Sequence, residues 1–232
     1  DNYKDDLRRP AVVRAFVRNW KATNPLASNQ NLIDAVADRS KSVQADTIYT
    51  IGSDLSKEDF KYAFQKLACE GDLIFVAGAS GKYGQEEIFR FSQRLSYDST
   101  LRFWERVVNA DILDTEGLYA VAMLGHQHWV EMQKLCLLVI SKSVLSAEQL
   151  MNVCEKYDSR KEVAMAAIAT GLLSDDQIIS LFSGSWQRRL EWDEVVGYLR
   201  LSDRTVEDLI NLGEKANSDK LWPSITKAIN SK

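Results

Sequence analysis

The chain has 232 residues, of which 45% are hydrophobic and 27% charged, a composition typical of a globular protein rather than a disordered or collagen-like one. Its formal net charge is −4, so the chain as a whole lacks the basic surface that duplex nucleic acid or an anionic membrane requires. No apolar run approaches the ~18 residues of a membrane span, so we expect no membrane-spanning helix. Because the first residue is Asp1 rather than Met, we expect that a preceding segment was removed.

The scarcity of chain-breaking residues favours an all-α fold. Only three prolines and eleven glycines occur, too few for a β architecture with many turns. We expect N-terminal helices and a connector over residues 1–55, followed by a helical-repeat body over residues 56–232. A single continuous domain over residues 1–232 is the alternative.

The first elements are predicted from apolar spacing and from capping residues. Val13, Phe16 and Val17 recur at helical spacing, and Pro10 suits the first turn of that helix, where its missing N–H costs nothing. A second helix is expected around Leu32, Ile33 and Val36. The β-branched stretch 47–51 is interpreted as a loop or extended connector. Ser56, with Asp59 three residues later, then predicts the start of a helix.

An internal repeat is the most informative pattern. Three densely apolar segments lie about forty-five residues apart, each between two more amphipathic ones: Leu73 to Gly78, Leu118 to Met123 and Val163 to Ile168. Between Ser56 and Phe182 this pattern resembles HEAT-like repeats, without a signature residue. The resemblance implies a tandem array of helical hairpins, an α-solenoid. A multi-helix bundle explains the same periods and remains the alternative.

Gly78, Gly81 and Gly84 follow an apolar segment at a spacing similar to that of dinucleotide-binding turns. Such a turn needs a second parallel strand after its helix, and residues 100–110 are instead predicted to form an amphipathic helix. We therefore expect a helix that ends near Gly78 and a glycine-rich turn to the next helix. A nucleotide-dependent enzyme that uses these glycines is kept as the less favoured function.

The residues that could bind metal or act as nucleophiles are few. Cys69, Cys136 and Cys154 are irregularly spaced among apolar residues, which predicts buried free thiols and a reducing compartment such as the cytoplasm. His126 and His128 are two positions apart and would point to different faces of a helix, so zinc is not expected. Neither histidine has an obvious nucleophile beside it, and we expect no cofactor and no catalytic site.

The function expected from these patterns is that of a non-catalytic scaffold or adaptor that binds a protein partner through a helical-repeat surface. The candidate contact residues are Trp186, Arg188 and Arg189, which follow a Ser-Gly-Ser turn and belong to types enriched at binding hot spots. The alternative is nucleic-acid binding through a local basic face. Its candidate residues are Arg8, Arg9, Arg14, Arg18 and Lys21, together with Arg188 and Arg189.

Overall fold

The computed structural model of the chain describes residues 2–124, 129–158, 160–183, 192–216 and 218–231, and these residues form helices and turns without a strand. The all-α class is therefore confirmed. The structure divides into two compact units, Asp1–Leu113 and Asp114–Lys232. The expected boundary between residues 55 and 56 falls inside the first unit. No helix in the described ranges is long and apolar enough to cross a membrane.

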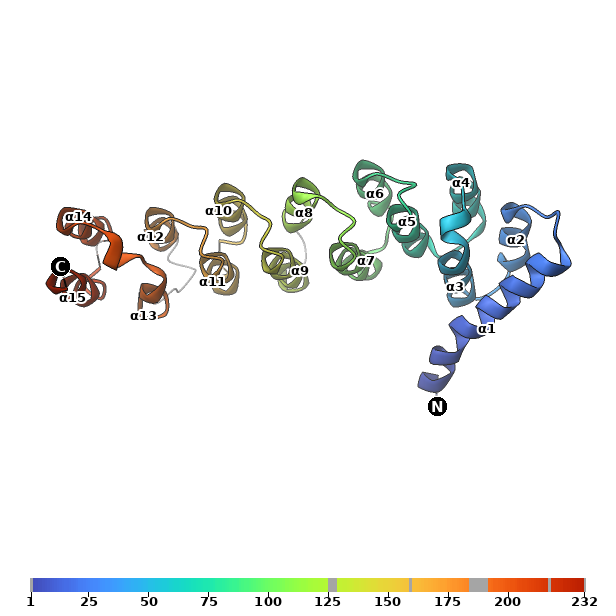
Figure 1. Cartoon of the computed structure of the whole chain (residues 1–232), viewed down its shortest axis with the longest axis horizontal. Helices are drawn as coiled ribbons and strands as arrows, with labels where there is room; N and C mark the ends of the chain where they lie inside the picture. Colours follow the sequence, from blue (N-terminus) through green and yellow to red (C-terminus); the bar gives the residue numbers. More distant parts are fainter. Residues whose placement is uncertain (1, 125–128, 159, 184–191, 217, 232) are drawn as a thin grey trace. The chain divides into compact units, whose positions relative to one another are not determined.

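Residues 2–113, the described part of unit 1, form seven α-helices and a short 3-10 helix. Their bounds are α1 Asn2–Thr23, α2 Asn29–Val36, α3 Lys41–Ile51, η1 Gly52–Asp54, α4 Lys57–Lys66, α5 Glu70–Ala79, α6 Gln85–Ser92 and α7 Tyr97–Asn109. Helices α2, α4 and α6 lie along one side of this unit and α3, α5 and α7 along the other (Figure 1). Accordingly α2 packs on α4, whereas α3 packs on α1 and α5, and α5 packs on α7. Unit 1 thus has two layers of helices.

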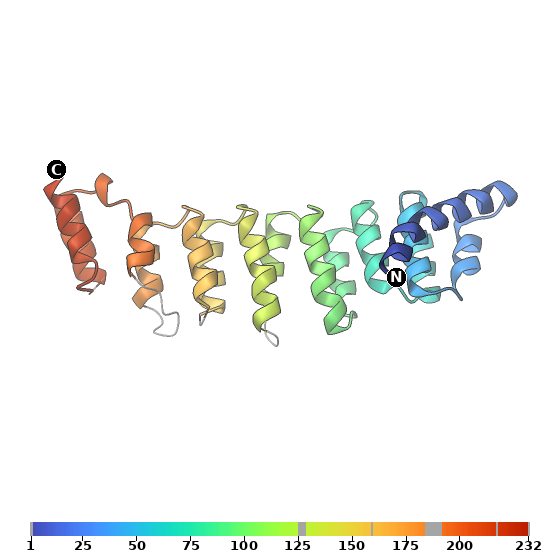
Figure 2. The same cartoon turned by 90° about the horizontal axis from the view of Figure 1, so that it is seen from below.

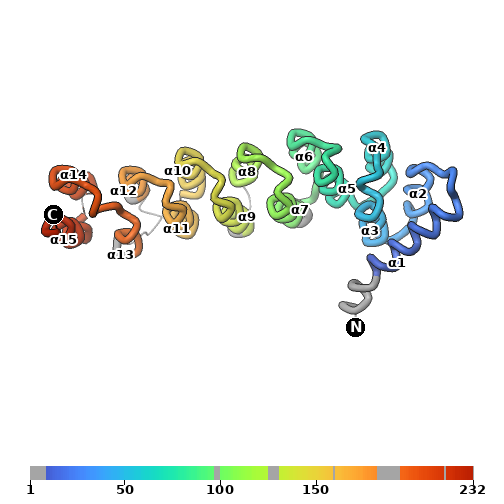
Figure 3. Tube along the Cα trace, viewed as in Figure 1, coloured from blue at the N-terminus to red at the C-terminus, as the bar shows by residue number. Residues whose placement is uncertain are grey.

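Unit 2 has the same kind of layering. Its helices are α8 Thr115–Ala122, α9 Trp129–Ser141, α10 Ala147–Lys156, α11 Lys161–Ala169, α12 Asp175–Ser183, α13 Trp192–Val195, η2 Val196–Tyr198, η3 Leu201–Asp203, α14 Val206–Ala216 and α15 Trp222–Asn230. Helix α9 packs on α11, and α12 packs on α14. The helices of this unit stand side by side when seen from below (Figure 2), and Figure 3 shows α8, α10, α12 and α14 in one layer and α9, α11, α13 and α15 in the other.

Polar side chains link successive helices within a layer. In unit 1 the Tyr62 hydroxyl donates to Asp34 Oδ1 at 2.7 Å, which joins α4 to α2. In unit 2 Gln149 Nε2 donates to Glu116 Oε1 at 2.9 Å, which joins α10 to α8. The partners of these two bonds are 28 and 33 residues apart in the sequence. The sequence therefore returns to the same layer about every thirty residues.

Capping residues recur at the same interval at the start of the even-numbered helices. They lie 28 to 32 residues apart, and most use a side-chain oxygen to accept a backbone N–H of the first turn: Ser28, Ser56, Gly84, Asp114, Ser146, Ser174 and Thr205. The forty-five-residue register had aligned α8 with α11. Because α8 lies in the same layer as α10, to which it is bonded, whereas α11 lies in the same layer as α9 (Figure 1), the register that aligned α8 with α11 is wrong.

The expected position of Pro10 in the first turn of its helix is also wrong. Helix α1 begins at Asn2, so Pro10 lies in its interior rather than in its first turn. The packing of Val13 and Val17, each 4% exposed, and an ion pair from Arg9 to Asp46 hold α1 against α3 despite the missing N–H.

The stretch 47–51 is not a connector but the C-terminal half of α3. Ile48 and Ile51 are buried, and burying such a side chain contributes about 1.5–3 kcal/mol. This gain exceeds the helix-propensity penalty of a β-branched residue, which is below about 1 kcal/mol. The Thr47 hydroxyl also donates to the Val43 carbonyl at 2.8 Å.

Candidate functional site

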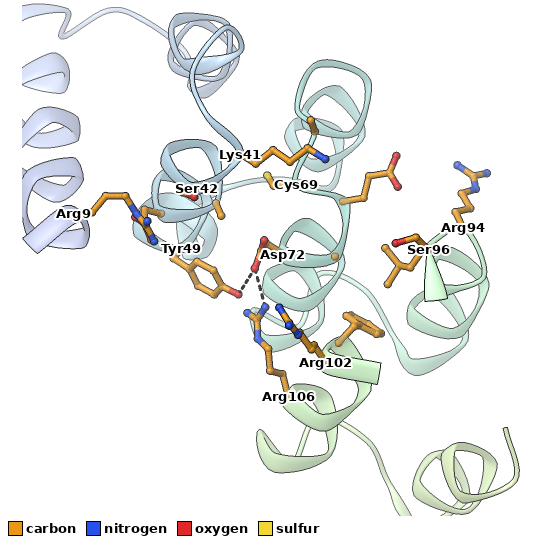
Figure 4. A pocket seen from close by; sticks show the side chains of 17 residues that line it. Arg9, Lys41, Ser42, Tyr49, Cys69, Asp72, Arg94, Ser96, Arg102 and Arg106 are labelled. Atoms are coloured by element: carbon orange, nitrogen blue, oxygen red, sulfur yellow. Dashed lines mark hydrogen bonds and ion pairs between the residues drawn. The ribbon is translucent and has the colours of Figure 1, made fainter. Parts of the chain in front are cut away.

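A charged pocket of about 830 Å³ lies in unit 1 between α3, α5 and α7 (Figure 4). These three helices belong to the same layer (Figure 1). Helix α1 and the connection from α6 to α7 complete the wall. The pocket is lined by Arg9, Lys41, Ser42, Ala45, Asp46, Tyr49, Ala68, Cys69, Glu70, Gly71, Asp72, Arg94, Leu95, Ser96, Arg102, Phe103 and Arg106.

Asp72 is the centre of the polar contacts in this pocket. Its Oδ1 accepts a hydrogen bond from the Tyr49 hydroxyl at 2.9 Å and one from Arg106 Nη1 at 2.8 Å (Figure 4). The Arg106 guanidinium also lies 4.3 Å from the ring centroid of Phe75 and 5.3 Å from that of Tyr49. These cation–π contacts and hydrogen bonds fix the Tyr49 ring, which is 43% exposed. The pocket thus presents an aromatic ring in a preset orientation.

Desolvation is the largest influence on the pKa values of Asp72 and Arg106. Burial, together with repulsion from the Asp46 carboxylate, raises the pKa of Asp72 above its ordinary value despite the Arg106 ion pair. Burial likewise lowers the pKa of Arg106, although an arginine remains a cation at neutral pH. Both shifts follow from the loss of water around a charged group.

Cys69 is the only thiol in the pocket lining, and its environment keeps it protonated. Burial, reinforced by the nearby Asp72 charge, raises the pKa of this thiol to about 12. Since the thiolate is the reactive form, Cys69 is not an activated nucleophile. The lining contains no histidine that could act as a base. The pocket residues therefore favour binding over nucleophilic chemistry.

The pocket carries more positive than negative charge. Arg9 is neutralised by Asp46, at 2.6 Å, and Arg106 by Asp72. The remaining cations, Lys41, Arg94 and Arg102, are exposed and form no ion pair within the described part of the chain. One further carboxylate, that of the exposed Glu70, also lies in the wall. Arg102 and Arg106 both extend from α7 toward Asp72, and Arg94 lies across the pocket from Arg9 (Figure 4).

A second pocket, of about 760 Å³, lies in unit 2 between the starts of α8 and α10. Its lining includes the carboxylates of Glu116 and Glu148 and contains no lysine or arginine. Two of its lining residues are linked, since the Asn152 side chain donates to the Tyr119 hydroxyl at 3.2 Å. The two pockets therefore differ in the sign of their charge.

The contact residues predicted from the sequence, Trp186, Arg188 and Arg189, lie outside the described residues, as do His126 and His128. Their roles stay predictions. The pocket residues were missed because no local motif brings them together: Lys41, Arg94 and Arg102 come from three separate elements. The only sequence signal was Tyr49, an aromatic residue in the stretch interpreted as a connector.

The basic N-terminal residues divide into paired and unpaired groups. Arg9 pairs with Asp46, and Lys21 Nζ lies 3.0 Å from Asp54 Oδ2. Arg14 and Arg18 are exposed and have no ion pair among the residues that the structure describes. The side chain of Arg8 lies outside the part of the chain that the structure describes. The pairing reduces the positive charge that this helix would offer to a phosphate backbone.

The glycine-rich segment forms a turn between two helices, as expected. Gly78 lies inside α5, where a Cβ would stand 2.7 Å from Ile88 Cδ1, so it permits the close approach of α6. Gly81 has φ +68°, in the left-handed region that favours glycine. Because Leu73 to Gly78 are helical, the strand that a dinucleotide site requires is not formed there.

No group of three or more His, Cys, Asp or Glu side chains is placed to hold a metal ion within the described ranges. A comparison with known protein families, curated proteins and solved structures finds no match to this chain.

Proposed function

We propose that the chain is a non-catalytic scaffold, a tandem array of two-helix units that binds a protein partner. Three features support the array: the recurrence of caps every 28 to 32 residues, the alternation of helices between two layers in each unit, and the bonds between helices of the same layer. Stacked hairpins of this kind offer extended surfaces on which partner chains dock.

The observation that carries the proposal is the exposed Tyr49 ring beside Arg106. Tyrosine and arginine are among the residue types that dominate binding energy at protein interfaces. Here the hydrogen bond from Tyr49 to Asp72 and the stacking of Arg106 hold the ring in place before any partner arrives. Preorganisation of this kind lowers the entropic cost of association. The polar, open pocket around the ring suits a docking surface.

Nucleic-acid binding has less support from the same residues. The pocket mixes cations with the carboxylates of Asp46, Glu70 and Asp72, and these would repel a phosphate backbone. The exposed cations of α1 that lack a partner, Arg14 and Arg18, do not belong to the pocket lining.

Affinity capture with matched variants tests the proposal. The tagged full-length chain is used to capture partners from its native cell extract, and each recovered protein is purified and its binding measured directly. Tyr49→Ala should weaken binding by about tenfold or more, as expected for truncation of a hot-spot aromatic residue. Tyr198→Ala is the control, because Tyr198 is equally exposed, at 44%, but lies in unit 2.

Two results would overturn the scaffold function. One is that no purified protein binds the wild-type chain directly. The other is that a nucleotide or metabolite co-purifies with the chain and is turned over. If a partner binds wild type and Tyr49→Ala equally, the scaffold function stands but the partner docks elsewhere.

A further inference from the structure

The unit 1 pocket has a charge pattern that selects the chemistry of its ligand. Two of its five cations are neutralised inside the pocket, by Asp46 and Asp72, and the other three are not. Lys41, Arg94 and Arg102 come from α3, from the α6–α7 connection and from α7, so they surround the opening from different elements. We infer that this pocket binds an acidic peptide segment whose carboxylates pair with these three residues; the inference rests on the proposed protein-binding function.

The donor geometry of the free cations suits carboxylates. An arginine guanidinium can donate two parallel hydrogen bonds to one carboxylate, and a lysine ammonium adds a compact charge with three donors. The Arg94 guanidinium lies 5.5 Å from the ring centroid of Phe91, which restricts the orientations of its side chain. Because Arg102 lies one helical turn before Arg106, the Arg106–Asp72 pair holds the neighbouring turn of α7 against α5.

The acidic residues of the pocket distinguish a peptide from a phosphate polymer. A polyphosphate or DNA backbone offers acceptors only, so it would be repelled by the carboxylates of Glu70 and Asp72 and could donate no hydrogen bond to them. A peptide carries backbone N–H donors as well as carboxylates, and the exposed Glu70 carboxylate can accept such donors. The exposed ring of Tyr49 and the partly exposed Leu95 provide contact for apolar side chains between the acidic ones.

The size of the pocket fits several residues rather than a single anion. Its volume of about 830 Å³ lies in the upper part of the range found for ligand pockets. In Figure 4 Arg9 and Arg94 mark opposite sides of it, with Asp72 between them. An extended segment that crosses the pocket can therefore meet Lys41, Arg102 and Arg94 with different carboxylates.

Fluorescence anisotropy with defined probes tests this inference on the full-length chain. The probe is a short fluorescein-labelled peptide of alternating glutamate and alanine, and its comparison peptide has glutamine in place of glutamate. At low salt the glutamate peptide should bind at least about tenfold tighter, since each charge-assisted hydrogen bond is worth a factor of that order. Its affinity should fall as salt rises, because the contacts are exposed.

The double variant Lys41→Ala/Arg102→Ala should weaken binding of the glutamate peptide by about tenfold or more. The matched control, Arg14→Ala/Arg18→Ala, removes two exposed cations of the same unit that lie outside the pocket lining and should bind as wild type does. All four positions are exposed, so the melting temperatures should stay close to that of wild type. Circular dichroism checks this.

Three results would overturn the acidic-peptide inference. The first is equal binding of the glutamate and glutamine peptides, and the second is equal weakening by the pocket and control variants. The third is tighter binding of a labelled single-stranded oligonucleotide than of the glutamate peptide, with loss of that binding in the pocket variant. If the capture experiment yields a partner that depends on Tyr49 while the glutamate peptide fails to bind, the scaffold function survives and only the acidic chemistry is wrong.

Discussion

Replacing Gly52 with alanine should destabilise unit 1 by overfilling the contact between η1 and α5. Gly52 is buried and has φ −57° and ψ −35°, so alanine can adopt its backbone conformation without strain. The added Cβ would, however, stand 2.1 Å from Val76 Cγ1. Carbon atoms in contact normally lie about 3.5–4.0 Å apart, so one of the two groups must move by about 1.5 Å.

The expected loss follows from the ways in which this overlap can be relieved. Turning Val76 away from its preferred rotamer costs about 0.5–1.5 kcal/mol, and moving α5 adds a penalty typical of overpacking, about 1–3 kcal/mol. Alanine restricts the unfolded chain more than glycine does, which returns about 0.4–1 kcal/mol. The net change in the free energy of unfolding should be a loss of about 0.5–4 kcal/mol, with a central value of about 2 kcal/mol.

Urea denaturation of the full-length chain, with hydrogen exchange measured on peptides from α3 and α5, gives the readout. The control is Gly197→Ala, because a Cβ at Gly197 meets nothing within 4 Å. In the double variant Gly52→Ala/Val76→Ala the Val76 methyl groups are absent, so the new Cβ no longer clashes with them. The loss of stability in the double variant should therefore be smaller than the sum of the two single losses by about 1 kcal/mol or more. A neutral Gly52→Ala variant, or strictly additive losses, would refute the clash.

Three further predictions concern stability in unfolding experiments. Gly84→Ser should gain a few tenths of a kcal/mol, because Gly84 has nearly the backbone angles of the cap Ser56 and a serine there could accept an N–H of α6; a loss would contradict this. Asp72 has a raised pKa in the fold, so its ionised form opposes folding, and wild type should gain stability relative to Asp72→Asn as pH falls from about 7 toward the unfolded pKa of 3.8. A difference that shrinks as pH falls would mean that the Arg106 ion pair dominates instead. Tyr157→Phe should lose about 1 kcal/mol, because the buried hydroxyl donates to the Ala122 carbonyl at 3.2 Å; an unchanged melting temperature would argue against that bond.

The sequence predicted well those helices whose start is marked by a capping residue and an amphipathic stretch next to it. Ser56 and Ser146 each precede an amphipathic stretch, and both form capping boxes at the starts of α4 and α10. Their side-chain oxygens satisfy backbone N–H groups within three residues, so no tertiary information is needed. The burial of Leu32, Ile33 and Val36 in α2 also followed from spacing alone.

Features that depend on distant neighbours could not be predicted in this way. Gly213 lies inside α14, where a Cβ would stand 2.8 Å from the Trp222 ring, so a glycine at this position permits the close approach of α15 and does not mark a helix end. The repeat length was misjudged for a similar reason: α5, α8 and α11 are alike in composition but not in their packing partners. The pocket combines residues of α1, α3, α5 and α7, so only the folded chain brings them together.

The three cysteines make the chain a natural reporter of its own local opening. Cys69 lies in unit 1, whereas Cys136 and Cys154 lie in unit 2, and all three are buried. A thiol that is shielded in the closed state can be alkylated only during the moments in which its surroundings open. The rate at which each cysteine acquires a label therefore measures the opening of its own unit, without any engineered probe. Mass spectrometry of the labelled peptides would then show whether the two units open together or independently.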